Sequence, residues 1–394
     1  MAVFNESMSA LLLDAPNRTA NVQNIPIPTP GPGELLIRVH AIALNPVDAL
    51  YTFKPLGASG RTVGSDFAGT VVSSIPGPSR EVADAPTSSP GDRVSGFLQG
   101  ACSVNDRPGG FSDYPVCPAD LVWRVPESMS FEEASTISLC GLTAAQALFQ
   151  RLGLTAPWDT TSQAANPTRE LYALIYGAST SVGLYAAQLL NLSAKHSNTT
   201  IHLLGTASPA RFDFLHAAPY SYEHLISYRS PTWPTEIRAL TPEGRGVDIA
   251  LDCISQNTTV GQVSSTLRDD GRLAVLRSRA AGAWDASLVP SHVDPLYDAV
   301  WRGLGERVQY HSMVLEANAE MRQFSREFYE WLSNGGEVSV QSNPVRRMPG
   351  GLAKVVQDGF MLVGEGDVVK SAEGRGEEWM KPISGEKLVY TLVQ

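Results

Sequence analysis

The sequence predicts an α/β protein with two domains, one mostly β and one built on a doubly wound parallel sheet. Short strands separated by turn residues fill residues 1–140, apolar strands alternate with helices over 141–316, and a helix and a terminal strand follow in 317–394. The length of 394 residues also exceeds that of an ordinary single domain. We therefore expect either two domains or one domain split by an insert.

The strands of the first region are marked by apolar residues that follow Gly/Pro turns. ELLIRVHAIAL at 34–44, DFAGTVVSSI at 66–75 and GDRVSGF at 91–97 have this pattern. The periodicity becomes helical over 131–153, where Ser130 is the expected N-cap. This region is therefore predicted to be a β domain that leads into a helix.

The middle region contains strands that are apolar on both faces. The runs LYALIY, TIHLLGTA, VDIALDC and RLAVL alternate with helical stretches such as LYAAQLLNLSAK. Strands of this kind belong to a parallel sheet covered by helices on both sides. The last region begins with an amphipathic helix at 319–336 and ends with the strand KLVYTLVQ.

Composition excludes several classes of protein. Acidic residues outnumber basic ones 40 to 30 and no Lys/Arg run occurs, so nucleic acid is not an expected partner. The stretch 1–21 has neither the basic flank nor the length of a signal peptide or membrane span, which favours a cytoplasmic protein. The four scattered cysteines predict reduced thiols, with a Cys102–Cys117 disulfide as the alternative.

The stretch YGASTSVG joins an apolar strand to an apolar helix. Gly177 ends the strand and Gly183 lies in the first turns of the helix, but the middle glycine of a dinucleotide fingerprint is absent. The hydroxyl groups in the turn favour a pyrophosphate site at the helix N-terminus over a purely structural turn or a nucleophile elbow. The residues assigned to this site are Gly177, Ser179, Thr180, Ser181, Val182 and Gly183.

The end of the next strand bears on the type of cofactor. LLGTASPARFDF places Ser208 and Arg211 there, and the first acidic residue is Asp213. An NAD site usually has an acidic residue at this point, whereas a hydroxyl and a guanidinium suit a 2′-phosphate. NADPH is therefore favoured over NADH, and the alternative is a Ser-Pro helix start with a solvated arginine.

These features together resemble the medium-chain dehydrogenase/reductase superfamily, in which a GroES-like β catalytic domain is split by a Rossmann domain. The resemblance covers nearly the whole chain and is carried, in order, by LNPVD, GSDFAGTVV, GDRVSGF, GGFSDYPV and LVWRVPESMSFEEAS. Within the superfamily, YGASTSVG, ALDCIS and SGEKLVYTL are most similar to the trans-acting enoyl reductases of fungal polyketide synthases.

The resemblance implies a reaction and further site residues. NADPH would deliver hydride to the β-carbon of an α,β-unsaturated acyl thioester on the carrier domain of a polyketide synthase or a hybrid with a nonribosomal peptide synthetase. The enzyme would be a monomer. The implied cofactor contacts include Asn45, Pro46, Asp48, Thr180, Ser181, Ser208, Arg211 and Tyr228, with Thr143 near the nicotinamide. Tyr228 could instead be a buried strand-end residue, and Thr143 could serve only in capping or packing.

By the same resemblance we expect no metal. Ser65 and Asp66 stand where zinc-dependent relatives have a His-Glu pair, and the structural cysteine lobe is missing. His40 and His202 lie in apolar strand patterns and are expected to be core or surface residues rather than ligands.

The chain departs from the family pattern at one candidate catalytic position. Related enoyl reductases commonly have a lysine two residues after the Asp of the NP-x-D motif, and this chain has Leu50 there. Lys54, four residues later, could reach the pocket or could be a surface lysine. Leu50, Lys54 and Thr143 are the candidate catalytic residues. The alternatives are a quinone or free-enone reductase, or a non-reductive enzyme that catalyses an isomerisation or cyclisation.

Overall fold

The computed structural model describes residues 7–77, 88–160, 170–311, 313–335, 340–364 and 375–392. The chain forms two compact units. Unit 1 comprises Met1–Leu139 and Trp301–Gln394, and unit 2 comprises Cys140–Val300. Each unit is described by itself below.

Unit 1 is built on a seven-stranded sheet with the order β16-β17-β3-β4-β5-β7, in which β6 also pairs with β3. Its strands are β3 (Glu34–Ala43), β4 (Asp66–Ile75), β5 (Arg93–Phe97), β6 (Val116–Pro118), β7 (Val122–Arg124), β16 (Val345–Met348) and β17 (Lys387–Thr391). The C-terminal strand β17 thus lies between β16 and β3, parallel to the first and antiparallel to the second. This places the end of the chain beside residues near its beginning.

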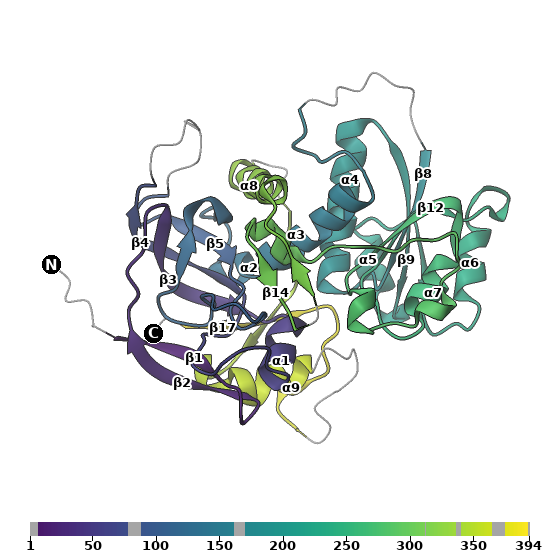
Figure 1. Ribbon diagram of the computed structural model, residues 1–394. Coiled ribbons are helices and arrows are strands. Elements are labelled where there is room, and N and C mark those ends of the chain that lie inside the picture. The colour runs from purple at the N-terminus through teal and green to yellow at the C-terminus, as the bar shows by residue number, and fades with distance from the viewer. Residues whose placement is uncertain are drawn as a thin grey trace. The chain divides into compact units, whose positions relative to one another are not determined.

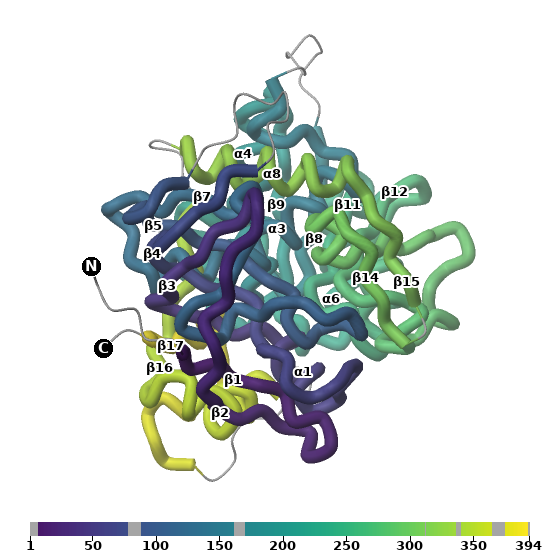
Figure 2. The backbone as a smooth tube through the Cα atoms, turned by 60° about the vertical axis from the view of Figure 1, so that its left-hand side comes forward, coloured from purple at the N-terminus to yellow at the C-terminus, as the bar shows by residue number. Residues whose placement is uncertain are grey.

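Two hairpins and several helices complete unit 1. The remaining strands are β1 (Ser7–Asp14), β2 (Thr19–Pro26), β14 (Val308–Gln309) and β15 (Val314–Leu315), and the helices are α1 (Pro46–Phe53), α2 (Phe131–Ala134), α8 (Ala319–Asn334) and α9 (Met361–Val363). The β1–β2 hairpin lies beside α1 (Figure 2). The core of the unit contains the fully buried aromatic residues Phe67, Phe111, Phe360 and Tyr390.

Unit 2 is a doubly wound parallel sheet (Figure 1). The strands run in the order β10-β9-β8-β11-β12-β13, and every pair is parallel. They are β8 (Glu170–Tyr176), β9 (Thr200–Ala207), β10 (His224–Ser227), β11 (Val247–Asp252), β12 (Leu267–Val275) and β13 (Leu296–Tyr297). Counted along this sheet, the order is 3-2-1-4-5-6, which is that of the Rossmann fold. This architecture and the split β domain confirm the predicted fold class.

The helices of unit 2 lie against this sheet. They are α4 (Ser181–Ser197), α5 (Phe212–His216), α6 (Trp233–Ala239) and α7 (Thr259–Ser264). Their apolar residues and those of the strands form a core of their own, which includes Leu204, Trp233, Ile237 and Val263. The helix α3 (Ser138–Ala145) spans the boundary between the units and continues as a π-helical segment, Gln146–Arg151.

The structure refines three expectations about local structure. Ser130 caps α2 by accepting a hydrogen bond from the Glu133 N–H, but the predicted helix 131–153 is interrupted after α2. The segment 301–316 belongs to unit 1, where the ring of Trp301 packs 5.7 Å from that of Phe97. All four cysteines are free, so the alternative of a Cys102–Cys117 disulfide is wrong.

Candidate functional site

The turn between β8 and α4 closes tightly on the first turn of the helix. Gly177 has a left-handed backbone with φ of 79°. Thr180 is the N-cap of α4, and its Oγ1 donates to the Gly177 carbonyl at 2.8 Å and accepts the Gly183 N–H at 3.1 Å. A Cβ on Gly183 would lie 2.5 Å from the Gly177 carbonyl oxygen. Glycine at 183 is therefore required for the turn to close in this way.

This turn presents the N-terminus of a long helix to an anion. The first N–H groups of any α-helix have no partners within the helix, and the helix dipole adds positive potential there. Because α4 has 17 residues, its N-terminus is well suited to bind a phosphate. The half-buried residues Ser179, Ser181 and Val182 lie at the same turn, so the predicted turn residues are brought together.

The end of β11 supports the turn from the neighbouring strand. Buried Asp252 accepts hydrogen bonds from the Ile254 and Ser255 N–H groups, both at 2.8 Å, and from the Thr259 hydroxyl at 2.7 Å. Burial raises the pKa of Asp252, and these donors oppose the rise. The side chain of Ile254 lies 3.2 Å from where a Cβ on Gly177 would be. Strand order reverses between β8 and β11, and crevices at such points bind dinucleotides.

Polar and cationic side chains gather after β9 and β10. Ser208 and Arg211 follow β9 and are half-buried, and the first acidic residue after β9 is Asp213. The Arg229 guanidinium donates to the Ser208 hydroxyl at 3.3 Å and lies 5.0 Å over the ring of Tyr228. Tyr228 is 41% exposed, so it is not a buried strand-end residue. The Ser208 hydroxyl with the Arg229 guanidinium, and Arg211 three residues after Ser208, are the kinds of group that bind a phosphate monoester, such as the 2′-phosphate of NADPH.

Arg229 is a member of this cluster that the sequence analysis missed. The signal was a basic residue shortly after the apolar run HLI, which is part of β10. That strand has only four residues and no flanking glycine motif, so nothing local indicated that it ends beside Ser208.

In unit 1, the start of α1 is held by a buried polar network. Asp48 accepts the Asn45 N–H at 2.8 Å and the Ser65 hydroxyl at 2.5 Å. Asn45 donates its side-chain amide to Asp66 at 2.9 Å, and the Lys387 ammonium group donates to Asn45 at 2.7 Å and to Asp66 at 2.8 Å. All five side chains are buried. We call these residues the Lys387 network.

The network joins four parts of unit 1 and contains one unusual carboxyl group. Asp66 begins β4, Lys387 begins β17, and the other Asp66 carboxylate oxygen accepts the Leu139 N–H at 2.9 Å. Burial raises the pKa of Asp48 to about 7, although its bonds with Ser65 and Asn45 act in the opposite direction. Asn45 and Asp48 are thus engaged inside unit 1, and the third predicted member of this motif, Pro46, is the exposed first residue of α1.

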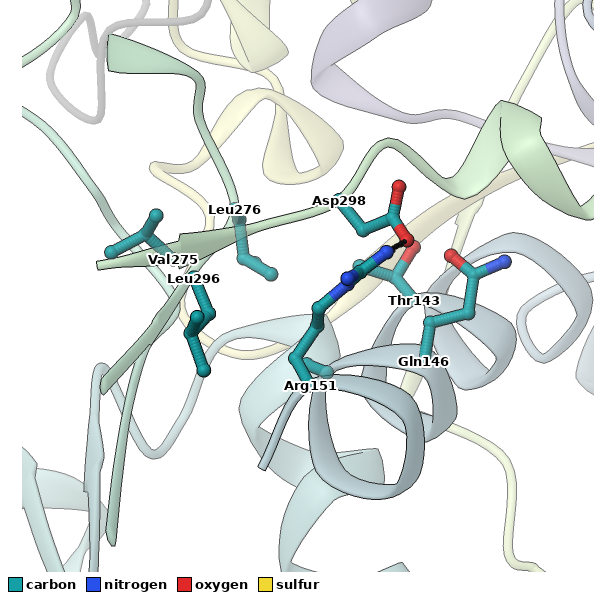
Figure 3. Close-up of a pocket in the computed structure, with 8 residues that line it drawn as sticks. Thr143, Gln146, Arg151, Val275, Leu276, Leu296 and Asp298 are labelled. Carbon is teal, nitrogen blue, oxygen red and sulfur yellow. Dashed lines mark hydrogen bonds and ion pairs between the residues drawn. The ribbon is translucent and has the colours of Figure 1, made fainter. Parts of the chain in front are cut away.

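The candidate catalytic residues lie in different units of the structure. Leu50 is half-buried in α1, and exposed Lys54 ends this helix with its N–H donating to the Leu50 carbonyl at 2.7 Å. Thr143 lies in α3 within unit 2, beside a cavity of about 10 Å³ that also adjoins Arg151 and Asp298 (Figure 3). The Arg151 Nε donates to the Asp298 carboxylate at 3.1 Å. A cavity of that size holds about one water molecule.

The histidines are engaged in other contacts. His40 lies 3.2 Å from the Thr70 hydroxyl and stacks on Phe131, and His202 lies between two glutamates at 2.7 Å each. Among the residues that the structure describes, no three His, Cys, Asp or Glu side chains are placed to hold a metal ion. No helix in the same part of the chain is long and apolar enough to cross a membrane.

Comparison with known proteins gives consistent matches. The alcohol dehydrogenase GroES-like domain family matches residues 31–127. The enoyl reductase of CurK has a TM-score of 0.68 at 19% identity, covering 99% of this chain and 100% of that structure. A mycobacterial protein complexed with NADPH has a TM-score of 0.65 at 21% identity, over 98% of this chain and 100% of that one. Both structures have the same fold as this chain.

Curated relatives match over the full length. The trans-enoyl reductase traG of Penicillium crustosum is 28% identical, over 98% of this chain and 98% of its own. The trans-enoyl reductase caaB of Aspergillus niger is 31% identical, over 99% of this chain and 98% of its own. With the split β domain and the Rossmann unit described above, these matches show that the chain belongs to the trans-enoyl reductase family of the medium-chain dehydrogenase/reductase superfamily.

Proposed function

We propose that the protein is an NADPH-dependent trans-acting enoyl reductase. It would reduce α,β-unsaturated acyl thioesters carried by a polyketide synthase, including one fused to a nonribosomal peptide synthetase. The observation that carries the choice of cofactor is the cluster of Ser208, Arg211 and Arg229, which combines a hydroxyl with two guanidinium groups. A carboxylate at this place would repel a 2′-phosphate, and the first one after β9 is Asp213 in α5.

The residues of unit 2 have separate tasks in this proposal. The N-terminus of α4, which Thr180 shapes as its N-cap, would hold the pyrophosphate together with Ser181, and the cluster at Ser208 would hold the 2′-phosphate. When bound, the cofactor supplies a hydride for the β-carbon of the acceptor. Fixing both phosphate groups restricts the position of the nicotinamide before the reaction, which is the main way such a site lowers the barrier.

The position of Leu50 bears on the second half of the reaction. After hydride addition, the α-carbon needs a proton, and a leucine side chain has neither a charge nor a proton to donate. In this proposal, water supplies that proton, and Thr143 orients the acceptor. We expect the enzyme to act as a monomer in the cytoplasm, where its synthase would present the acyl chain.

A direct assay tests the proposal. Purified protein should oxidise NADPH in the presence of crotonyl-pantetheine and give the saturated thioester, and NADH should be a poorer cofactor. Replacing Arg211 and Arg229 with alanine should remove most of this preference, about tenfold for each charge-assisted hydrogen bond lost. Arg279→Ala, at an exposed arginine elsewhere in unit 2, is the matched control. The proposal would be refuted if the protein did not bind NADPH, or if it oxidised NADPH without reducing the thioester.

Substitution at Leu50 tests the two other activities. Leu50→Lys should raise kcat with crotonyl-pantetheine if protonation limits the rate, and Leu50→Met controls for a change in packing. A quinone or free-enone reductase would instead turn over 1,4-benzoquinone or methyl vinyl ketone faster than the thioester. A non-reductive enzyme would bind NADPH and leave the thioester unreduced in both the wild-type and the Leu50→Lys protein.

A further inference from the structure

A hollow of about 520 Å³ on unit 1 is lined by three basic side chains from distant parts of the sequence. They are Arg18, Lys54 and His311, and all three are exposed. The remaining lining consists of Ala15 and the segment 55–57, which is Pro-Leu-Gly. The hollow is shallow and open to solvent, so it would contact one end of a ligand rather than enclose it. In a chain with a formal net charge of −10, such a concentration of basic groups is a local feature.

The walls of the hollow are fixed to one another by hydrogen bonds. Arg18 has a left-handed backbone, with φ of 52°, at the tip of the β1–β2 hairpin. The N–H of Ala15 in the same tip donates to the Ser59 hydroxyl at 2.9 Å, which ties the hairpin to the loop after α1. The His311 Nε2 lies 3.0 Å from the Leu56 carbonyl oxygen. These bonds fix the backbone segments that carry the three basic side chains.

The space beside Gly57 is occupied by a buried side chain. A Cβ on Gly57 would lie 2.3 Å from the Arg61 guanidinium, which donates to the Ser103 carbonyl at 2.6 Å. The nearby carboxylate of Asp14 accepts from the side-chain amide of Asn17 at 2.8 Å within the hairpin turn. This acidic group is thus engaged locally.

The chemistry of the lining selects a class of ligand. Two permanent cations and an imidazole favour a phosphate group, and Pro55 and Leu56 offer apolar surface beside it. A phosphate ester at the end of an amphipathic arm has both features. The hollow lies at the C-terminal end of α1, where the N–H of Lys54, the C-cap, donates to the Leu50 carbonyl at 2.7 Å.

We propose that this hollow binds the phosphate of the 4′-phosphopantetheine arm that carries the acyl chain. This inference rests on the proposed function, because it assumes a carrier-bound thioester. It adds a specific role for Arg18, Lys54 and His311 as the groups that distinguish a phosphorylated pantetheine arm from an unphosphorylated one. Coenzyme A contains the same phosphopantetheine chemistry and is the other source of such a ligand.

The test compares three thioesters in the same NADPH oxidation assay: crotonyl-pantetheine, crotonyl-4′-phosphopantetheine and crotonyl-CoA. For wild type, kcat/KM should be about tenfold higher with the phosphorylated arm than with crotonyl-pantetheine, as expected for one charge-assisted hydrogen bond. In Arg18→Asn combined with His311→Asn, this ratio should fall toward one. Asparagine is chosen at 18 because it tolerates the left-handed backbone. Arg38→Ala, at an exposed arginine of β3, is the control and should keep the wild-type ratio.

The outcomes separate this inference from the proposed function. If the ratio of kcat/KM for the phosphorylated arm to that for crotonyl-pantetheine is the same in wild type and the double variant, the phosphate site is wrong, and the proposed reductase activity is unaffected. A strong preference for crotonyl-CoA over crotonyl-4′-phosphopantetheine assigns the hollow to the nucleotide part of coenzyme A and overturns the carrier-arm inference. If no thioester is reduced, the proposed function fails, and calorimetric titration with 4′-phosphopantetheine decides the site alone. Saturable binding of 4′-phosphopantetheine to wild type, lost in the double variant, supports the phosphate site. Absence of binding to wild type overturns the phosphate site.

Discussion

Lys387 is a buried lysine whose partners lie more than 300 positions earlier in the chain. Its ammonium group bonds to Asn45 and Asp66, and the side chains of Lys387 and Asp66 are 2% and 0% exposed. Burying a charge is costly unless it is paired, so each member of this pair depends on the other. The arrangement ties the C-terminal strand to the start of α1.

We predict that Lys387→Met lowers the free energy of unfolding by about 3–5 kcal/mol, because it leaves the Asp66 carboxylate buried without its cation. Urea denaturation followed by circular dichroism measures the change. Lys381→Met, at an exposed lysine six positions earlier, should change stability by less than about 0.5 kcal/mol. The double variant Lys387→Met with Asp66→Asn should recover part of the loss. A double variant no more stable than Lys387→Met would contradict this account.

Asp48 should make stability depend on pH. Its pKa is about 7 in the folded protein, against an ordinary value of 3.8. Between these values the folded state holds a proton that the unfolded state has lost, so stability falls as pH rises from about 4 to about 7. Asp48→Asn removes this loss. The free energy of unfolding of Asp48→Asn minus that of wild type should therefore be larger at pH 8 than at pH 5.

The measurement for Asp48 is urea denaturation of both proteins at the two pH values. Asparagine can still accept the Asn45 N–H and donate to the Ser65 oxygen, so the cap of α1 is kept. Asp269→Asn, at an exposed carboxylate, controls for the loss of one negative charge. If the difference in free energy of unfolding between Asp48→Asn and wild type is the same at pH 5 and pH 8, the raised pKa of Asp48 is wrong.

At the scale of elements, the turn at 177–183 depends on close packing between β8 and α4. Alanine is a better helix former than glycine by up to about 1 kcal/mol, so propensity alone would favour Gly183→Ala. The added Cβ, however, would lie 2.5 Å from the Gly177 carbonyl oxygen and 2.9 Å from that of Ala178. Because these are backbone atoms, the turn itself must shift.

We therefore predict that Gly183→Ala weakens NADPH binding at least tenfold and lowers the melting temperature, since the amides of the turn move from the pyrophosphate position. Quenching of tryptophan fluorescence on titration with NADPH gives the Kd. Gly376→Ala, at a glycine with no atom within 4 Å of a built Cβ, is the control for the substitution itself. Unchanged NADPH affinity in Gly183→Ala would show that the turn does not hold the pyrophosphate.

The elements differ in how far the sequence predicts them. Long strands with strong patterns, such as β3, β8 and β9, were found at nearly their observed bounds, because their periodicity is set by burial within each strand. The four-residue β10 and two-residue β13 were missed, because their pairing with β9 and β12 defines them more than their own residues. The alternation of strands and helices predicted a doubly wound parallel sheet but not the order of its strands, and the resemblance to the superfamily implied the Rossmann domain.

The candidate site was predictable to the same extent. The turn at 177–183 and the pair of Ser208 and Arg211 are local in sequence, so the sequence alone suggests them as cofactor contacts, and that role stays a prediction. Arg229 and Lys387 have no such local signal. Arg229 meets Ser208 through the pairing of β10 with β9, and Lys387 meets Asp66 across 321 positions of the chain. A lysine at the start of an otherwise apolar strand, KLVY, was the one local sign of the buried pair.

At the scale of the whole molecule, the chain passes from unit 1 to unit 2 and back. The larger core of unit 1 and the core of unit 2 are built from different residues, so each unit buries its own apolar surface. Units with separate cores can unfold in separate steps, and a ligand stabilises the state to which it binds. The residues proposed to bind NADPH, at the turn 177–183 and in the cluster of Ser208, Arg211 and Arg229, all belong to unit 2.

Calorimetry should therefore show two unfolding transitions that respond to different changes. NADPH at 100 times its Kd should stabilise the unit 2 transition by about 2.7 kcal/mol. Lys387→Met should lower the transition of unit 1 and leave the shift caused by NADPH intact, because the Lys387 network lies in unit 1. Gly183→Ala should reduce that shift. A single transition that moves as a whole with both NADPH and Lys387→Met would show instead that the two cores unfold as one cooperative unit.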